Sequence, residues 1–159
     1  MHYYATEEKI RSNWTAYTNI SGRTIYKKPV SDILDTEDEI TLEFKYSSVK
    51  NTYSLSNVLG IDLNGGSEYS IKFALLCQKY SRAYSYYSSN SSYRNKEGTS
   101  TSLSSNSVYK MVYKNGQCTW YKDDVQFAQY SIENTSSSSL RFDYFGDNDT
   151  SHLEYLIIL

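Results

Sequence analysis

Residues 109–130 of this chain are Tyr-Lys-Met-Val-Tyr-Lys-Asn-Gly-Gln-Cys-Thr-Trp-Tyr-Lys-Asp-Asp-Val-Gln-Phe-Ala-Gln-Tyr. The pair Asn115-Gly116 predicts a two-residue type I′ hairpin turn, because both central residues of that turn need a positive φ and these two residue types tolerate it best. A turn at this point sets the pairing of the flanking strands: Lys114 with Gln117, Tyr113 with Cys118, Val112 with Thr119, and Met111 with Trp120.

A second tight turn is predicted at Asp123-Asp124, which makes the segment a three-stranded meander and places Trp120 opposite Phe127. Side chains alternate between the two faces of a strand. One face of the meander should therefore be apolar, with Met111, Trp120 and Phe127. The other should be polar, with Lys110, Thr119, Tyr121 and Gln126. A dry face and a wet face are typical of an antiparallel sheet in a sandwich.

Other segments also show period-two alternation, and their spacing favours an all-β antiparallel sandwich. The predicted strands are Thr24–Lys27, Ile40–Tyr46, Asn57–Leu63, Tyr69–Lys79, Val108–Tyr130 as the meander, Ser139–Phe145 and Leu153–Leu159. Thr6–Trp14 is the one segment that suits a short helix. The polar stretch Ser88–Ser107 is interpreted as a long loop or a frayed hairpin.

The 159 residues suit a single domain, 1–159, and the net charge of -2 argues against nucleic acid as a partner. No apolar run approaches the about 18 residues of a membrane span, so direct membrane insertion is not expected. The chain ends within an apolar strand, which suggests a module of a larger protein. Cys77 and Cys118 lie on apolar strand faces by parity; buried thiols are the favoured interpretation, and a single disulfide between the sheets is the alternative.

Three segments resemble the concanavalin A-like jelly-roll superfamily: Glu39–Lys45, the block Tyr109–Asp124, and the closing pair Leu140–Gly146 and Leu153–Ile158. This superfamily includes laminin-G-like domains, carbohydrate-binding modules, and modules of phage tail fibres and surface adhesins. The resemblance implies two curved antiparallel sheets, with ligands bound on the concave face or on the loops at one rim. It transfers no individual sugar-binding residue to this chain.

The sequence contains no recognisable catalytic motif. It therefore predicts that the chain is not an enzyme and has no catalytic residues. Glycoside hydrolysis needs two carboxylates across one bond, whereas Glu37, Asp38 and Glu39 are adjacent in a turn. His152 is interpreted as a turn residue. No cofactor or metal is predicted. The alternative is a calcium site at Asp143, Asp147 and Asp149, which carry the oxygen ligands that Ca²⁺ prefers.

A recognition surface is predicted where Tyr and Arg alternate after the strand that ends at Lys79. The proposed ligand-binding residues are Tyr80, Arg82, Tyr84 and Tyr86 as an exposed ladder, with Tyr93 and Arg94 on the rim loop. Aromatic faces can stack on sugar rings, and Tyr and Arg can hydrogen-bond hydroxyl groups. The alternative is a Tyr ladder that covers the sheet or packs against another protomer.

The sequence therefore favours a non-catalytic recognition module for a cell-surface or polysaccharide glycan, as part of a surface adhesin or a phage tail or receptor-binding protein. Its expected partner is a glycan or cell-surface receptor, with a homo-oligomer as a further assembly. The expected location is extracellular, at a cell surface or on a virion. The alternative function is a structural spacer or oligomerisation module of a fibre or adhesin that binds no ligand.

Overall fold

The computed structural model describes residues 1–20, 23–50, 57–63, 70–77, 80–88, 94–96, 101–131, 138–146 and 151–159. At 18–20, 57–58, 62–63, 70–77, 80–88, 94–96 and 130 it describes the backbone alone. Among the described residues, no helix is both long and apolar enough to cross a membrane.

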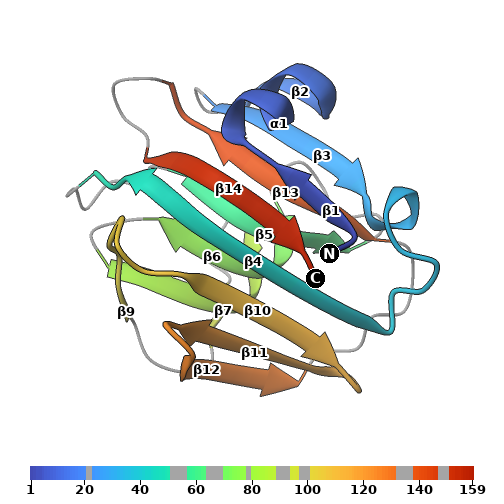
Figure 1. Cartoon of the computed structure of the whole chain (residues 1–159), viewed down its shortest axis with the longest axis vertical. Helices are drawn as coiled ribbons and strands as arrows, with labels where there is room; N and C mark the ends of the chain where they lie inside the picture. Colours follow the sequence, from blue (N-terminus) through green and yellow to red (C-terminus); the bar gives the residue numbers. More distant parts are fainter. Residues whose placement is uncertain are drawn as a thin grey trace.

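Two antiparallel sheets form the molecule and pack face to face as a β-sandwich (Figure 1). The first is six-stranded, in the order β1 (Tyr3–Ala5), β14 (His152–Ile158), β4 (Glu39–Ser48), β10 (Tyr109–Lys114), β11 (Gln117–Lys122) and β12 (Val125–Ser131). The second is eight-stranded, in the order β2 (Thr15–Ile20), β3 (Arg23–Pro29), β13 (Ser138–Tyr144), β5 (Asn57–Leu63), β6 (Ser70–Cys77), β7 (Tyr80–Ser88) and β8 (Arg94–Lys96), with β9 (Thr101–Ser102) also pairing with β7. The all-β sandwich predicted from the alternation is confirmed.

The first hairpin of the meander has the predicted register at every pair from Lys114 with Gln117 to Met111 with Trp120. Asn115 and Gly116 have φ values of 53° and 72°, as a type I′ turn requires. The second turn is also confirmed, with positive φ at both Asp123 and Asp124. Local turn chemistry therefore determines this part of the fold.

The predicted pairing of Trp120 with Phe127 is wrong, because the register between β11 and β12 shifts between Trp120 and Tyr121. A β-bulge of this kind adds one residue to one strand and displaces all the pairs beyond it. Trp120 consequently faces Ala128, which is buried, while Phe127 is half-buried at the border of the core. Thr119, predicted on the wet face, is buried there and accepts a hydrogen bond from the Gln129 side-chain amide at 3.1 Å.

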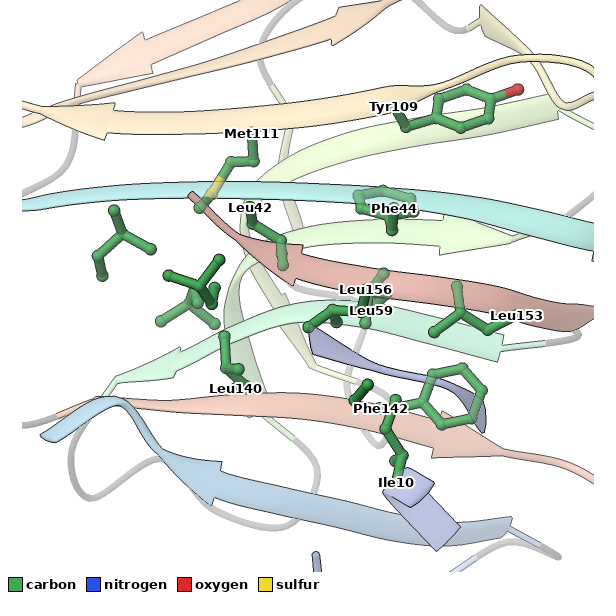
Figure 2. Close-up of a cluster of buried hydrophobic side chains, with 14 of the residues drawn as sticks. Ile10, Leu42, Phe44, Leu59, Tyr109, Met111, Leu140, Phe142, Leu153 and Leu156 are labelled. Carbon is green, nitrogen blue, oxygen red and sulfur yellow. The ribbon is translucent and has the colours of Figure 1, made fainter. Parts of the chain in front are cut away.

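The core lies between the sheets and consists of the apolar positions that alternate along their strands (Figure 2). Strand β4 contributes Ile40, Leu42, Phe44 and Tyr46, and β13 contributes Leu140, Phe142 and Tyr144. Trp120 is fully buried, and its ring meets that of Phe44 edge-on at 6.5 Å between centroids. Trp120 is a core residue, as the hairpin register predicts.

The predicted helix is present as α1 (Glu7–Asn13), which connects β1 of one sheet to β2 of the other. Thr6 is its N-cap, since its side-chain oxygen accepts a hydrogen bond from the Lys9 backbone N–H. Ile10 is the buried residue of the helix and enters the core. Strands β1 and β2 on either side of the helix were not predicted, because they are short or lack strong alternation.

The predicted strand Tyr69–Lys79 ends earlier, since β6 stops at Cys77 and Tyr80 begins the separate antiparallel strand β7. The stretch predicted as a loop or frayed hairpin, Ser88–Ser107, contains β8 and β9, which both pair with β7. Polar strands at a sheet edge lack the apolar alternation on which sequence interpretation relies.

Asp123 gives the meander a pH dependence that can be measured. The Val108 backbone N–H donates to Asp123 Oδ1 at 2.9 Å, and this bond, followed by one from the Ser107 hydroxyl, lowers the pKa of the carboxyl below its ordinary value. A lowered pKa in the folded state stabilises the protein at pH values above the unfolded-state pKa of about 3.9. This added stability is lost as the pH falls through the folded-state pKa of Asp123.

We therefore expect Asp123→Asn to lower the urea midpoint at pH 6 and to have little effect at the acid end of a titration from pH 6 to pH 2. Asn tolerates the positive φ of this position. Asp124→Asn is the matched control, because its ion pair with Lys110 is long, at 3.8 Å, and exposed. An equal loss in Asp123→Asn at both ends of the titration would contradict this assignment.

Candidate recognition surface

The outer face of the eight-stranded sheet, opposite the core, is organised by strand register into two rows of residues. Register partners lie on the same face of a sheet, so each row runs across the strands at one level. The Asp143 row contains Tyr17, Ile25, Asp143, Val58, Leu76 and Arg82. The Arg141 row contains Thr15, Lys27, Arg141, Gly60, Ala74 and Tyr84.

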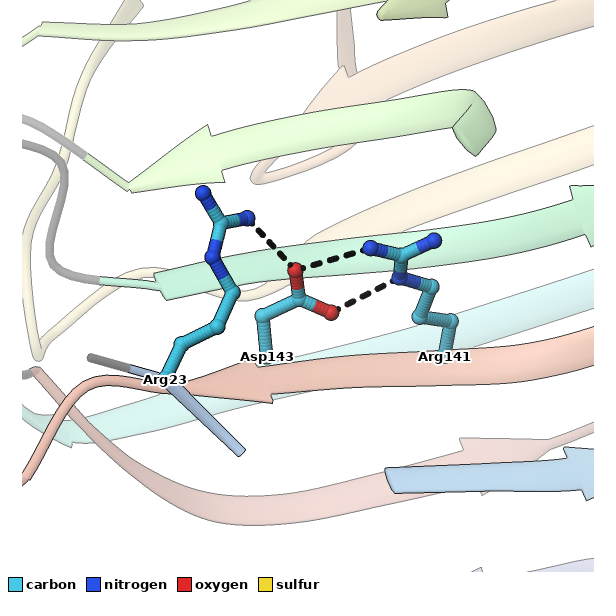
Figure 3. A network of polar contacts seen from close by, with 3 residues as sticks. All are labelled: Arg23, Arg141 and Asp143. Atoms are coloured by element: carbon cyan, nitrogen blue, oxygen red, sulfur yellow. Dashed lines mark hydrogen bonds and ion pairs between the residues drawn. The ribbon is translucent and has the colours of Figure 1, made fainter. Parts of the chain in front are cut away.

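A buried network of three charged side chains lies on this face (Figure 3). Arg141 donates from Nε to Asp143 Oδ1 at 2.8 Å and from Nη2 to Oδ2 at 3.1 Å, a bidentate pair. Arg23, the first residue of β3, donates from Nη1 to Asp143 Oδ2 at 2.9 Å. Arg141 and Asp143 are 1% and 0% exposed and Arg23 is 5% exposed. Two guanidinium groups thus share one carboxylate away from bulk water.

One donor of this network has no partner. Arg23 Nε is buried and makes no hydrogen bond. The Arg23 guanidinium also lies over the half-buried ring of Phe145, with Cζ 4.7 Å from the ring centroid. A buried unsatisfied donor on a charged group is unfavourable and is uncommon in native proteins.

An exposed aromatic ring lies in the Asp143 row. Tyr17 on β2 is 40% exposed, and Lys27 Nζ lies 5.2 Å from its ring centroid. Between Tyr17 and Asp143, Ile25 is fully buried although it does not belong to the core cluster. This part of the outer face combines an accessible ring, cationic groups and a sheltered apolar position. We call Tyr17, Arg23, Lys27, Arg141 and Asp143 the β3–β13 surface.

The predicted Tyr/Arg ladder begins on the same sheet. Arg82 and Tyr84 of β7 occupy positions in the two rows, and β7 is three strands from β13, which corresponds to roughly 14 Å. Tyr80 pairs with Ser102, and Tyr86 pairs with Asn95 after a shift in register. Arg94 begins β8 and pairs with Tyr87. Tyr93 is outside the described residues, and a binding role for these six residues stays a prediction.

The alternative calcium site is not assembled at Asp143. Asp143 belongs to β13 and not to the following acidic turn, and both of its carboxylate oxygens accept hydrogen bonds from Arg side chains. Asp147 and Asp149 are outside the described residues. Within the part of the chain that is described, no group of three or more His, Cys, Asp or Glu side chains could hold a metal ion.

The two cysteines belong to different sheets. Cys118 is fully buried on β11, as its parity predicts. Cys77 is the last residue of β6, and its side chain is outside the described residues.

A second polar cluster joins α1 to β14. Glu7 Oε2 lies 2.8 Å from His152 Nδ1, and Glu7 Oε1 accepts a hydrogen bond from the Leu153 backbone N–H at 3.1 Å. His152, predicted as a turn residue, is instead the first residue of β14. Both carboxylate oxygens of Glu7 are used to attach the helix to the sheet, so this cluster has a structural role.

Sequence interpretation did not identify Tyr17, Arg23, Lys27 or Arg141 as site residues. The alternation Leu140-Arg-Phe-Asp-Tyr contained a signal for Arg141, since Arg141 and Asp143 are two residues apart and must share the face opposite Leu140 and Phe142. Arg23 lies 120 residues from Asp143 in the sequence, and its role depends on the pairing of β3 with β13.

No protein-family model and no curated protein sequence matches this chain. Among solved structures, the galectin LEC-6 of Caenorhabditis elegans is 10% identical over 90% of this chain and 99% of that chain, with a TM-score of 0.51. The SPRY domain of human HERC1 is 9% identical over 87% and 82%, with a TM-score of 0.54. A glycoside hydrolase family 16 endo-glucanase from Bacteroides ovatus is 10% identical over 93% and 86%, with a TM-score of 0.50.

The endo-glucanase corrects one sequence-based prediction. The chain was predicted not to be an enzyme, but its fold is shared with a glycoside hydrolase across nearly its whole length, so that exclusion is wrong. Missing motifs are weak grounds for exclusion because catalytic residues can be supplied by strands that are distant in sequence. The architecture itself agrees in all three comparisons. This chain has the concanavalin A-like jelly-roll sandwich fold.

Proposed function

We propose that this chain is a carbohydrate-recognition domain that binds a cell-surface or polysaccharide glycan on the outer face of its eight-stranded sheet. The observation that carries the proposal is the β3–β13 surface. There the exposed ring of Tyr17 lies in the same register row as Asp143, whose buried carboxylate accepts hydrogen bonds from two guanidinium groups. Rings of this kind stack on sugars, and fixed polar groups confer specificity.

The charged and aromatic residues on the outer face of the six-stranded sheet are arranged differently, which favours the eight-stranded sheet as the binding site. Its charges form exposed pairs, such as Lys45 with Glu154 at 3.3 Å and Lys114 with Glu39 at 3.4 Å, which are typical of a solvated surface. Its exposed aromatic residue, Tyr4, is stacked on Tyr155 with 6.2 Å between ring centroids. On the eight-stranded sheet, Arg23, Arg141 and Asp143 are buried, and Arg23 Nε makes no hydrogen bond.

The predicted Tyr/Arg positions of β7 extend this surface. Arg82 lies in the same register row as Tyr17, and Tyr84 lies in the Arg141 row on the same face. A saccharide that lies across the strands could therefore contact Tyr17 at one end and the β7 positions at the other. The fold likeness to a galectin and to an endo-glucanase is compatible with a carbohydrate ligand. In this proposal the chain is part of a surface adhesin or of a phage tail or receptor-binding protein, located outside the cell or on a virion.

Two variants test the surface at its two ends. Tyr17→Ser removes the exposed ring of β2, and the double variant Tyr84→Ser with Tyr86→Ser removes the predicted rings of β7. We expect each to weaken binding to the best ligand of a glycan array at least tenfold, which is about 1.4 kcal/mol. Stability should change by less than a core truncation would cost, because Tyr17 does not belong to the core cluster and the sequence predicts Tyr84 and Tyr86 on the exposed face.

Tyr4→Ser is the matched control, since Tyr4 is 45% exposed but lies on the six-stranded sheet. It should leave glycan affinity unchanged. Binding that survives in both test variants and falls in Tyr4→Ser would move the site to the other sheet. An array on which the wild-type chain binds no glycan would overturn the proposed function itself.

A further inference from the structure

The side chain of Lys122, on the six-stranded sheet, holds a segment that pairs with the other sheet. We propose that Lys122 is a positioning residue for the recognition surface: through Ser102 of β9 it fixes the beginning of β7, the strand that carries the predicted Tyr/Arg ladder. This inference rests on the proposed function, because the ladder is the β7 part of the surface proposed there.

Strand β9 is too short to fix its own position. It consists of Thr101 and Ser102, and in the described residues its strand pairing consists of Tyr80 with Ser102 and Ser81 with Thr101. Ser102 is exposed, and two pairs at the edge of a sheet give little stability by themselves. The place of β9 therefore depends on contacts outside the strand pairing.

Those contacts come from the six-stranded sheet. Lys122 Nζ donates to the backbone oxygen and to the hydroxyl oxygen of Ser102, both at 2.9 Å. The Tyr109 hydroxyl donates to the same backbone oxygen at 3.2 Å and accepts from the Ser104 backbone N–H at 2.9 Å. Tyr109 and Lys122 reach the same residue because they are register partners across β10 and β11. We call the two bonds from Lys122 to Ser102 the Lys122 clamp.

The two side chains that hold Ser102 differ in their surroundings. Tyr109 is fully buried and stacked on Phe44, with 5.7 Å between ring centroids, so it is part of the core. Lys122 is half-buried at the end of β11, and the charge of its ammonium group strengthens both bonds to Ser102. Lys122 is therefore the residue whose replacement releases β9 without altering the core.

The contacts of the clamp run from one sheet to the other. At this edge of the sandwich, β12 of the six-stranded sheet contacts β7 of the eight-stranded sheet (Figure 1). Ser102, held by Lys122, is the register partner of Tyr80, the first residue of β7. Arg82 and Tyr84 follow on the same strand. A binding site loses affinity when its groups must be ordered on binding, so loss of the clamp should weaken glycan binding.

Hydrogen exchange tests the clamp by itself. Lys122→Met keeps the length of the side chain and removes the ammonium group. In this variant, the amides of 80–81 and 101–102 that are protected in the wild-type chain should exchange about tenfold faster. The amides of the β10–β11 hairpin should keep their rates. Lys110→Met is the matched control, because Lys110 is a half-buried lysine of the same sheet whose ion-pair partner is Asp124, at 3.8 Å.

Glycan affinity tests the positioning role. Lys122→Met should bind the best ligand of the glycan array about tenfold more weakly than the wild-type chain, and its melting temperature should fall by less than about 4 °C. Lys122→Arg keeps a charged donor and should restore most of the affinity, while Lys110→Met should bind like the wild-type chain. A lysine that only stabilised the fold would lower the melting temperature and leave the affinity of the folded protein unchanged.

Ser102→Ala tests the same contact from the other side. It removes the hydroxyl acceptor of an exposed residue and leaves the core unchanged, so it provides a folded variant if Lys122→Met does not fold. Because the backbone oxygen remains, its loss of affinity should be smaller, about threefold, and in combination with Lys122→Met it should add nothing. Losses that multiply in the double variant would overturn the direct bond as the cause.

This inference and the proposed function fail in different ways. Faster exchange in Lys122→Met with unchanged glycan affinity would overturn the positioning role, while glycan recognition stands. Unprotected amides at 80–81 and 101–102 in the wild-type chain, or unchanged exchange in Lys122→Met, would overturn the clamp itself. If the wild-type chain binds no glycan, the proposed function is overturned and the positioning role with it.

Discussion

Replacing Trp120 by Ala is expected to lower the free energy of unfolding by about 3–5 kcal/mol, the largest single effect that we expect from a core substitution in this chain. Trp120 is fully buried between the sheets, and its ring contacts the ring of Phe44 edge-on. Removing the indole would leave a cavity in the packed core, and the surrounding side chains relax only partly to fill it.

Urea denaturation followed by circular dichroism would measure this loss. Tyr121→Ala is a suitable control, because Tyr121 is the next residue of β11 and is half-buried on the other side of the bulge. It should cost clearly less than Trp120→Ala. Glycan affinity of any remaining folded Trp120→Ala protein should be unchanged, since the proposed surface lies on the other sheet. A folded variant that has lost glycan binding would place the site on the meander.

Replacing Asp143 by Ala should be nearly as destabilising, by about 3–5 kcal/mol, because it removes a buried carboxylate that accepts hydrogen bonds from two buried guanidinium groups. Breaking a buried pair by removing one partner leaves the other charge uncompensated, and that desolvated charge accounts for most of the cost. In this network two charges lose their shared partner together.

Thermal and urea unfolding would measure the effect against Glu154→Ala, which breaks the exposed pair with Lys45. The control should cost less than about 1 kcal/mol, since solvent screens exposed ion pairs. Asp143→Asn should fall between the two, because the amide can still accept one hydrogen bond while it removes the negative charge. Equal stability of Asp143→Ala and Glu154→Ala would show that the network contributes no more to folding than an exposed ion pair.

The register of the first hairpin and the identity of its buried face could be predicted because both depend on short-range chemistry. Positive φ at Asn115 and Gly116 determines the turn, and the turn determines each pair as far as Trp120. The N-cap at Thr6 is equally local, since its side chain bonds within the same helical turn. The buried alternation of β4 follows from the period of the strand itself.

Features that depend on contacts between distant segments could not be predicted. The bulge after Trp120 shifts the pairing of β11 with β12 by one residue, and the alternation of the two strands did not predict it. The pairing of β1 with β14 joins the two ends of the chain, and short strands of this kind carry little pattern of their own. The split between β6 and β7 changes a predicted continuous strand into two antiparallel ones.

The sequence by itself determined the fold class, the meander and the core positions of its strands, because alternation and turn residues act over a few neighbouring peptide units. The tertiary structure alone decided the candidate site. Arg23 and Asp143 are brought together by the pairing of β3 with β13. This pairing places the Arg-x-Asp sequence of β13 in a buried network in which Arg23 Nε has no hydrogen-bond partner. Burial and pairing of this kind are properties of packed sheets, and no short segment encodes them.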